Sequence, residues 1–423
     1  MSDAISKYGH MNNLLRYIEN NTSDDLETEL LSSVGYVSRG KLYYDFYSLS
    51  GHSVKEYIRK RRLSNALALI KTSDMALTDI AFGCGYSSHQ ALCRTIKQTL
   101  GMTPSEYKSG DIYYFFPPWN GEPLQSVIVT GETIPETLRV RFYHSNLSNI
   151  ENMAVGMFLQ VFPAYNGRIF GRNGEQAGNK LCYELYLTDI NIDFDRLRSY
   201  GFDPKCVVPR FTATFATSTV QNDEQKINAA WNYLYSEWLH KSMFEYTGEF
   251  YYEEYIIKNG KPAKLKLYLP IRKRGEDTKI TVINNPGFRF IAAKAKGNDA
   301  EETASKMMTD YLTTHCPHMI NSSKELYIQK RANTYVCGIR VSPDFQLAAN
   351  GSIMDFTTDQ NKYLVLESSV MGDYDRHADM LLTFAWENGM DADPKGIFAV
   401  YDVKESFRNP KIKMYCPIKI CTK

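Results

Sequence analysis

One segment near the N-terminus occurs twice, and this repeat restricts how the first hundred residues can fold. Residues 34–59 (VGYVSRGKLYYDFYSLSGHSVKEYIR) parallel residues 84–108 (CGYSSHQALCRTIKQTLGMTPSEYK). Each copy has Gly-Tyr, a serine-containing cap, a helical stretch, a glycine, a Ser or Thr cap and then Glu-Tyr. Because these residue types end and begin helices, each copy predicts a helix bounded by turns.

A long helix is predicted between the two copies. Ser53 followed by Glu56 is a capping box that opens a helix from Val54 to about Lys71, and Thr103 with Glu106 forms a second capping box. Two helix-turn-helix units joined by one helix would present two recognition helices on one face. At a separation of about 34 Å, these helices would enter adjacent major grooves of DNA.

The second copy resembles the DNA-binding module of the AraC/XylS family. The resemblance rests on LTDIAFGCGYSSHQALCRTIKQTLGMTPSEYK (77–108), in which Ile96 stands where the family usually has Phe. It implies that two helices face the bases of double-stranded DNA. The DNA-binding residues that follow from this resemblance are Arg39, Gly40, Tyr43 and Tyr44 in the first helix and His89, Gln90, Cys93 and Arg94 in the second.

These side chains suit base reading unequally. Gln90 can pair with adenine and Arg94 with guanine, each worth about 1–3 kcal/mol of discrimination. Gly40 stands where relatives often have a large side chain, so we expect the first helix to contribute mainly phosphate contacts. The alternative interpretation is a pair of packed helical hairpins without a role on DNA.

The charge of the chain gives little support to either interpretation. The formal net charge is +1, which favours neither nucleic acid nor an anionic membrane. Acidic residues cluster at 24–29 and basic residues at 59–62 (Arg59, Lys60, Arg61 and Arg62). We therefore expect a polarised surface, with the basic side on the central helix.

A second, longer repeat divides the remainder of the chain. KLKLYLPI (264–271) reappears as KIKMYCPI (411–418), about 147 residues later, and offsets within one residue of this value relate Tyr255 to Tyr401 and Trp238 to Trp386. Repetition at this length indicates two homologous domains. The predicted domains are a DNA-binding domain (1–109), a linker that packs against its neighbours (110–124), and two α+β domains (125–275 and 278–423).

Each of these two domains resembles the GyrI-like effector-binding domain, which is found fused to AraC-type modules in Rob-like regulators and in multidrug-responsive activators. The residues that carry this resemblance are YSEWL (235–239), FYYEEY (250–255) and LKLYLPI (265–271). The implied fold class is multidomain: an all-α double helix-turn-helix domain followed by two tandem α+β domains, each a duplicated β-α-β-β unit. The implied ligands are small cationic or amphipathic molecules.

A ligand site is predicted around Glu253. In a strand, Tyr251, Glu253 and Tyr255 share one face, and Trp238 lies on the helix expected to cover it. A carboxylate among aromatic rings is a plausible cage for an organic cation. The alternative is that Glu253 is exposed to solvent and the aromatic residues are core. The second copy has Ala399 at the corresponding position, which favours neutral ligands there, or a structural or partner-contacting role for that domain.

These features together predict a sequence-specific transcriptional regulator, an activator that recruits RNA polymerase and responds to a small-molecule effector. Two alternatives stay open: a GyrI-like hydrolase of small electrophilic compounds, and an adaptor whose C-terminal domains bind another protein. No nucleophile–base pair, P-loop or HExxH motif is present, so we expect neither catalytic residues nor enzymatic activity.

The sequence predicts no cofactor, metal site or membrane association. The eight cysteines are scattered without a CxxC pair, which argues against a zinc ribbon and against a secreted disulfide framework. No apolar run is long enough to span a bilayer. We expect a cytoplasmic protein associated with the nucleoid.

Overall fold

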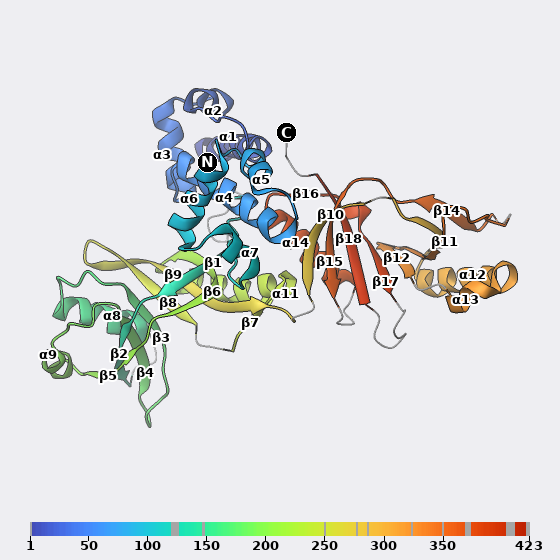
Figure 1. Ribbon diagram of the computed structural model, residues 1–423. Helices are drawn as coiled ribbons and strands as arrows, with labels where there is room; N and C mark the ends of the chain where they lie inside the picture. The colour runs from blue at the N-terminus through green and yellow to red at the C-terminus, as the bar shows by residue number, and fades with distance from the viewer. Residues whose placement is uncertain are drawn as a thin grey trace.

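The computed structural model describes ten segments of the chain. They are residues 2–119, 127–145, 149–248, 251–275, 278–285, 287–322, 325–348, 351–368, 374–402 and 411–419. Residues 120–124 of the predicted linker lie outside them. The described part forms a helical domain and two sheets that extend from it to either side (Figure 1).

The helical domain contains two equivalent helix-turn-helix units. Its helices are α1 (Ser2–Asn20), α2 (Thr28–Val34), α3 (Arg39–Ser50), α4 (Val54–Thr72), α5 (Leu77–Gly83), α6 (His89–Leu100) and α7 (Pro104–Ser109). The side chains of Ser38 and Ser88 accept the N-terminal hydrogen bonds of α3 and α6. Both helices end at a glycine in the left-handed region, Gly51 (φ 73°) and Gly101 (φ 75°). The two units therefore correspond residue by residue.

The first sheet is antiparallel and has the order β1-β6-β9-β8-β3-β4-β2-β5, with β7 paired to β9. Its strands are β1 (Ile128–Ile134), β2 (Thr137–His144), β3 (Ile169–Asn173), β4 (Leu181–Leu187), β5 (Phe202–Val208), β6 (Phe211–Gln221), β7 (Phe244–Tyr246), β8 (Tyr252–Lys258) and β9 (Lys261–Lys273). Its helices are α8 (Ile150–Val161), α9 (Phe194–Ser199) and α10 (Glu224–Asn232), which continues as the π-helical turn η1 (Tyr233–Trp238) and α11 (Leu239–Lys241).

The second sheet has the same topology, in the order β10-β15-β18-β17-β12-β13-β11-β14, with β16 paired to β18. Its strands are β10 (Lys279–Asn284), β11 (Arg289–Lys296), β12 (Glu325–Arg331), β13 (Thr334–Arg340), β14 (Ile353–Thr357), β15 (Lys362–Ser368), β16 (Asp391–Ala392), β17 (Phe398–Asp402) and β18 (Lys411–Lys419). Its helices are α12 (Ala300–His315), α13 (Pro317–Ser322), α14 (Tyr374–Glu387) and the short η2 (Pro394–Gly396).

The duplication inferred from the sequence is thus visible in the strand order. Each sheet contains two β-α-β-β units: β2-α8-β3-β4 and β6-α10-β8-β9 in the first, β11-α12-β12-β13 and β15-α14-β17-β18 in the second. The predicted fold class is confirmed. The predicted domain boundaries stay a prediction, although the first sheet runs from Ile128 to Lys273 and the second from Lys279 to Lys419.

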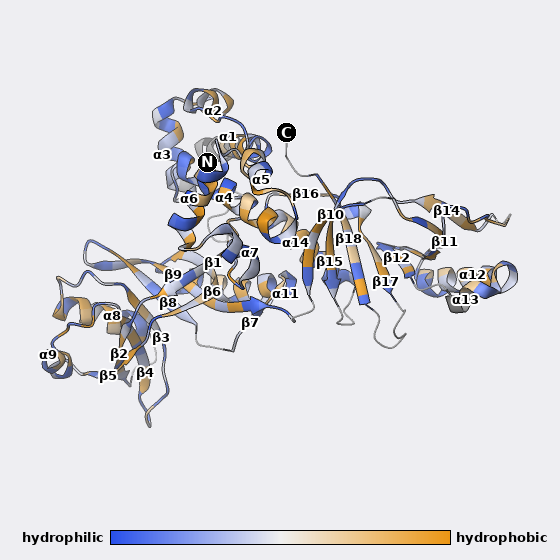
Figure 2. Ribbon diagram, viewed as in Figure 1, coloured by the Kyte–Doolittle hydropathy of each residue, from blue (hydrophilic) through white to orange (hydrophobic). Residues whose placement is uncertain are grey.

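All three parts meet in one core, in which the segment after α7 is wedged. The Phe115 ring lies 5.3 Å from that of Phe384 on α14 and 5.7 Å from that of Phe244 on β7. Phe116 donates its backbone N–H to Ser64 Oγ on α4 (2.9 Å). Hydrophobic residues gather where α14 approaches the helical domain (Figure 2). The predicted linker is therefore packed at residues 114–117 and 119, which are buried.

Across the described residues, no helix combines the length and the apolar character that a membrane span requires.

Candidate DNA interface and ligand groove

The predicted DNA-binding residues lie on α3 and α6, on the sides that face away from the core. Inward residues of both helices are buried: Leu42 and Phe46 on α3, Leu92 and Ile96 on α6. On α6, His89, Gln90 and Arg94 are exposed and Cys93 is half-buried. On α3, Arg39, Gly40, Tyr43 and Tyr44 are exposed. The helical spacing thus separates a packing side from an open side in both units.

The cations of α3 are engaged in local ion pairs. Arg39 pairs with Glu29 on α2, and Lys41 Nζ lies 2.9 Å from Asp45 Oδ2 one turn along the helix. Glu29 belongs to the acidic cluster noted in the sequence. Its proximity to α3 means that part of this cluster lies beside the first predicted recognition helix rather than on a separate face.

The expectation of a basic surface at 59–62 is wrong for half of these residues. Arg61 is fully buried, where it pairs with Glu19 Oε2 (2.9 Å) and donates to the carbonyl of Phe116. Arg62 donates to the backbone carbonyls of Thr22 and Gly85 (2.8 and 3.1 Å). The physical reason is that α4 is the central helix, so its polar side is covered by neighbouring turns.

The predicted ligand residues Tyr251, Glu253 and Tyr255 do line one groove on the first sheet. The groove has a volume of about 420 Å³. Glu253 Oε1 accepts from Trp231 Nε1 (2.9 Å), and Glu253 Oε2 accepts from the Tyr183 hydroxyl (3.1 Å). The Tyr183 and Tyr255 hydroxyls lie 2.6 Å apart. Glu253 is half-buried and hydrogen-bonded, so the alternative of a solvent-exposed carboxylate does not describe it.

The groove is lined by acidic, amide and aromatic side chains. The lining residues are Asn149, Glu151, Asn152, Asn173, Asn222, Glu224, Ile227, Asn228, Trp231, Tyr235, Tyr251, Glu253, Tyr255 and Leu265. No lysine or arginine occurs among these described residues. Burial raises the pKa of Glu253 above its ordinary value, against the hydrogen bonds from Trp231 and Tyr183, and the nearby charge of Glu151 adds to the rise.

Trp238 does not lie in this groove, which corrects the sequence-based prediction. It is buried on η1, stacks on Phe244 (18° between rings) and donates from Nε1 to Glu387 Oε1 on α14 (2.6 Å). Trp231, earlier on the same helix, contacts Glu253 instead. The sequence places both tryptophans on one helix. Only the position of the helix over the sheet decides which ring lies above Glu253.

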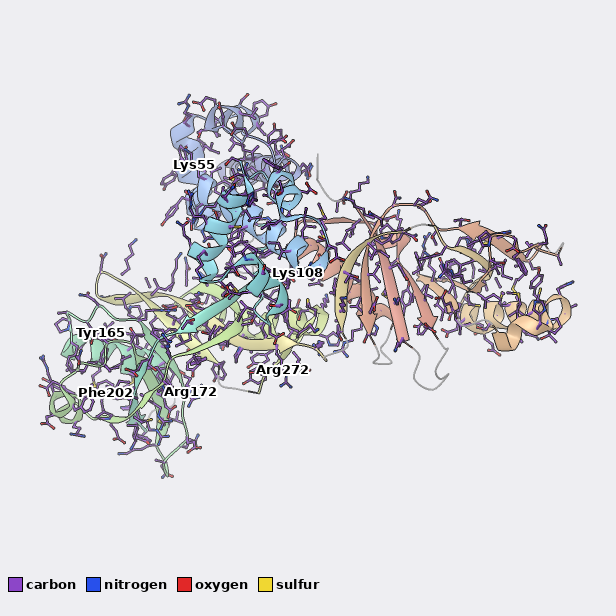
Figure 3. All side chains as sticks on the ribbon, in the orientation of Figure 1. Lys55, Lys108, Tyr165, Arg172, Phe202 and Arg272 are labelled. Carbon is purple, nitrogen blue, oxygen red and sulfur yellow. The ribbon has the colours of Figure 1, made fainter. Side chains whose placement is uncertain are left out.

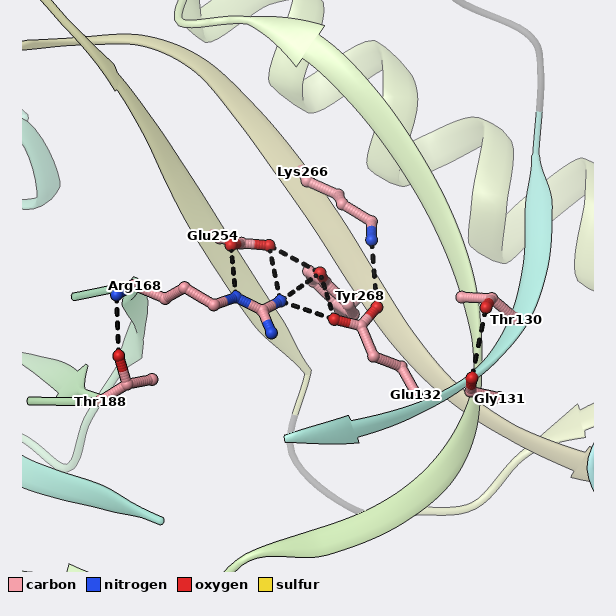
Figure 4. Close-up of polar contacts among 8 residues, drawn as sticks. All are labelled: Thr130, Gly131, Glu132, Arg168, Thr188, Glu254, Lys266 and Tyr268. Atoms are coloured by element: carbon pink, nitrogen blue, oxygen red, sulfur yellow. Dashed lines mark hydrogen bonds and ion pairs between the residues drawn. The ribbon is translucent and has the colours of Figure 1, made fainter. Parts of the chain in front are cut away.

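The neighbouring Glu254 points to the opposite face of the strand, where it belongs to a separate charge network that Figure 4 draws. Arg168 Nε lies 2.7 Å from Glu254 Oε1, and Arg168 Nη2 lies 2.6 Å from Glu132 Oε1. The Tyr268 hydroxyl donates to Glu254 Oε2 (2.6 Å), and Lys266 pairs with Glu132 (3.1 Å). Sequence reasoning missed this network because its members come from separate strands.

A second ion pair on this sheet joins buried Arg172, labelled in Figure 3, to Glu184 (2.7 Å). For Glu254, burial opposes ionisation, but the hydrogen bonds from Arg168 and Tyr268 outweigh it and hold its pKa below the ordinary value. Arg168 also lies over the Phe170 ring, with Cζ 4.7 Å from the ring centroid. The charges of this face are therefore mutually compensated.

In the second sheet the position of Glu253 is taken by Ala399, as the sequence repeat indicated. Glu253 is paired with Leu267, and Ala399 with Met414, in equivalent strand pairs. Ala399 is fully buried. The second copy thus lacks the carboxylate that defines the groove of the first.

Comparisons with known proteins concern the helical domain. Residues 31–110 match the family model of a helix-turn-helix domain. Right origin-binding protein of Escherichia coli (strain K12) is 26% identical over 133 residues, which are 31% of this chain and 44% of that protein. Multiple antibiotic resistance protein MarA of Salmonella typhimurium is 29% identical over 120 residues, which are 27% of this chain and 91% of that protein.

Among solved structures, the DNA-binding domain of AdpA in complex with a target DNA is 26% identical. The matched region covers 23% of this chain and 86% of the AdpA chain, with a TM-score of 0.22. The chain matches less than half the length of right origin-binding protein. The resemblance of the two sheet domains to GyrI-like domains stays a prediction. The N-terminal helical domain thus matches a helix-turn-helix family, and through this domain the chain is similar to multiple antibiotic resistance protein MarA and to right origin-binding protein.

Proposed function

We propose that this protein is a sequence-specific transcriptional regulator whose DNA binding is controlled by a small organic cation in the Glu253 groove. The observation that carries the proposal is the attachment of an AraC-type domain with two outward helices to a sheet domain with an acidic, aromatic groove. In this proposal the bound regulator activates transcription by recruiting RNA polymerase, an extension supported only by the similarity to AraC-type regulators.

The lining of the groove supports a cationic ligand. Glu253, Glu151 and Glu224 supply carboxylates, while Trp231 and Tyr251 supply aromatic rings. The two rings lie 5.1 Å apart at 66° to each other. A cation next to these rings gains cation–π attraction, and a partly desolvated carboxylate attracts it more strongly than one in water. Because Glu253 has no basic partner in the groove, a ligand cation would supply the missing charge.

The helical segment α10–η1–α11 and helix α14 together connect the groove to the helical domain. Trp231, on α10, donates to Glu253. Trp238, at the end of η1, donates to Glu387 on α14. The backbone carbonyl of Glu387 accepts from Arg61 Nη1 on α4 (3.4 Å), and α4 joins the two helix-turn-helix units. Both ends of this segment are thus fixed by tryptophan–glutamate hydrogen bonds.

The π-helical turn η1 between the two tryptophans is the element through which ligand binding would act. π-helical turns are rare, often occur at functional sites and close their hydrogen bonds over five residues instead of the four of an α-helix. A ligand that takes the place of Trp231 on Glu253 would release one end of the segment. The resulting shift at Trp238 would alter how α14 and α4 pack, and with them the spacing of α3 and α6.

The first experiment is selection of bound sequences from random duplex DNA by the whole chain at fixed, near-physiological salt. Salt is fixed because phosphate contacts alone give non-specific affinity. We expect enrichment of an asymmetric site that spans two adjacent major grooves. Absence of any enriched motif would contradict the proposal.

The second experiment tests control by ligand. Tetraphenylphosphonium serves as the probe cation in calorimetry, and operator affinity is then measured with and without it. Binding of the probe together with a changed operator affinity is the expected result. Binding of the probe with unchanged operator affinity would contradict control through this groove.

A further inference from the structure

The two helix-turn-helix units expose different chemistry at equivalent positions. The shared caps and C-terminal glycines align Tyr44 with Arg94 and Tyr47 with Lys97. Tyr44 is 72% and Tyr47 is 63% exposed. Arg94 and Lys97 are exposed as well. The outer side of α6 therefore presents cations where that of α3 presents phenol rings.

The local ion pairs strengthen this contrast. The cations of α3, Arg39 and Lys41, are paired with Glu29 and Asp45. None of the ion pairs formed within the described part of the chain involves Arg94 or Lys97. Phosphate oxygens would therefore compete with a carboxylate for the cations of α3 but not for those of α6.

The chemistry of base reading assigns different roles to these two sides. An arginine pairs with the O6 and N7 of guanine, and a lysine neutralises a phosphate. A tyrosine adds no positive charge, but its ring gives apolar contact of the kind that reads the C5 methyl group of thymine. Large, exposed rings on a helix that enters the major groove would bury against such methyl groups.

We propose that the two units read DNA by different means, α6 through Arg94 and Lys97 at guanine and phosphate, and α3 through Tyr44 and Tyr47 against thymine methyl groups, in place of the mainly phosphate contacts expected for α3 from the sequence. The operator then consists of a guanine-containing half-site under α6 and a thymine-rich half-site under α3. This inference rests on the proposed DNA-binding function and specifies which residues determine its specificity.

The decisive experiment replaces thymine by deoxyuridine, which removes only the C5 methyl group. The selected operator is first oriented with Arg94→Ala, which relaxes base preference in the half-site under α6. Deoxyuridine is then placed in the other half-site. We expect about a fourfold loss of affinity for each buried methyl group removed. In Tyr44→Ala the operator binds more weakly, and deoxyuridine at the contacted position causes no further loss.

Salt dependence provides the matched comparison. Lys97→Ala should reduce the slope of log affinity against log salt concentration by about 0.9, the value for one phosphate contact. Tyr47→Ala, at the equivalent position of α3, should weaken binding and leave the slope unchanged. Since both side chains are exposed, thermal unfolding of both variants should match that of the wild type.

The outcomes separate the two proposals. An enriched operator whose affinity does not change with deoxyuridine under α3 would overturn the thymine contacts and leave the regulator proposal standing. A reduced salt slope in Tyr47→Ala would overturn the assignment of uncharged contacts to α3. Absence of any enriched operator would instead contradict the proposed function itself.

Discussion

At the scale of single residues, Glu253 and Glu254 show how two adjacent carboxylates acquire opposite properties. Glu254 faces Arg168, and its pKa lies below the ordinary value. Glu253 faces the groove without a basic partner, and burial raises its pKa. In a strand, successive side chains point to opposite faces. Glu254 therefore lies on the face where arginine neutralises its charge, whereas Glu253, one residue earlier, lies on the face where the described groove residues offer no cation. Of these two carboxylates, therefore, Glu253 is the one that can attract a cation into the groove.

Glu253→Gln should lower the affinity for tetraphenylphosphonium by about thirtyfold or more, because removing the charged partner of a partly desolvated cation costs at least about 2 kcal/mol. The amide keeps the size of the side chain, and its oxygen can still accept from Trp231. Calorimetry measures the loss. Ala399→Ser, in the equivalent position of the second sheet, is the control and should leave affinity unchanged. Equal affinity of Glu253→Gln and wild type would remove Glu253 from the site.

Cation binding should weaken as the pH falls, and should do so at a higher pH than for an ordinary glutamate. The ligand carries a permanent charge, so only the protein titrates. Because burial raises the pKa of Glu253, its carboxylate takes up a proton before an exposed carboxylate does. Calorimetric titrations with tetraphenylphosphonium between pH 7.5 and pH 5 measure the effect. In the lower part of this range, binding of the cation should release the proton from Glu253. The affinity of Glu253→Gln should not change over this pH range. A wild-type affinity that is equally independent of pH would contradict the role of this carboxylate.

At the scale of elements, two tryptophans that correspond in the sequence repeat, one on the segment α10–η1–α11 and one on α14, lie in different environments. Trp238 is buried at the junction with α14, and Trp386, its counterpart in the sequence repeat, is 41% exposed on α14. The repeat made the two positions correspond, but α14 of the second sheet is where the first sheet and the helical domain dock. This docking buries Trp238 between η1 and α14 and leaves Trp386 partly exposed at the surface.

Trp238→Phe should destabilise the protein by about 1–3 kcal/mol, because the buried Glu387 carboxyl group loses its Nε1 partner. Trp386→Phe is the matched control and should change stability little, since its ring is partly exposed. Urea unfolding followed by tryptophan fluorescence compares the two. Equal loss in both variants would mean that ring volume, and not the hydrogen bond, is responsible.

At the scale of the whole molecule, the three parts are joined through buried polar groups as well as apolar contacts. Arg61 of α4 contacts Glu19 of α1, the carbonyl of Phe116 and the carbonyl of Glu387. Phe115 packs against both sheet domains. A junction held by directional hydrogen bonds fixes the orientation of its parts more narrowly than apolar contact alone, and the proposed control of DNA binding through the groove depends on such a junction.

The stability of this junction should depend on pH through Glu387. Burial raises the pKa of Glu387 to about 8, against the hydrogen bond from Trp238. A carboxyl group whose pKa is raised in the folded state stabilises the fold at low pH, and this contribution is lost as pH rises from about 4.5 to about 8. Glu387→Gln should therefore melt at a temperature close to that of the wild type near pH 5 and higher than the wild type above pH 8. Parallel melting curves over this range would contradict a buried neutral carboxyl group.

Much of the architecture follows from local sequence patterns. The caps and glycines around α3 and α6 determine both helix-turn-helix units, because helix ends depend on residues within a few positions of each other. The Y-x-P-I strand repeat indicated the duplicated sheets, and the alternation of Tyr251, Glu253 and Tyr255 placed them on one face. Inward and outward sides of the recognition helices followed from helical spacing alone.

The sequence did not predict several contacts between segments that lie far apart in the chain. The burial of Arg61, the choice of Trp231 over Trp238 above Glu253, and the pairing of Glu254 with Arg168 all depend on how helices and strands from separate elements are placed. Spacing rules describe the period of one element and not its position over another. Local order was therefore set by the sequence itself, whereas the partners of the buried charges, and with them the chemistry of the groove and the junction, were decided only by tertiary packing.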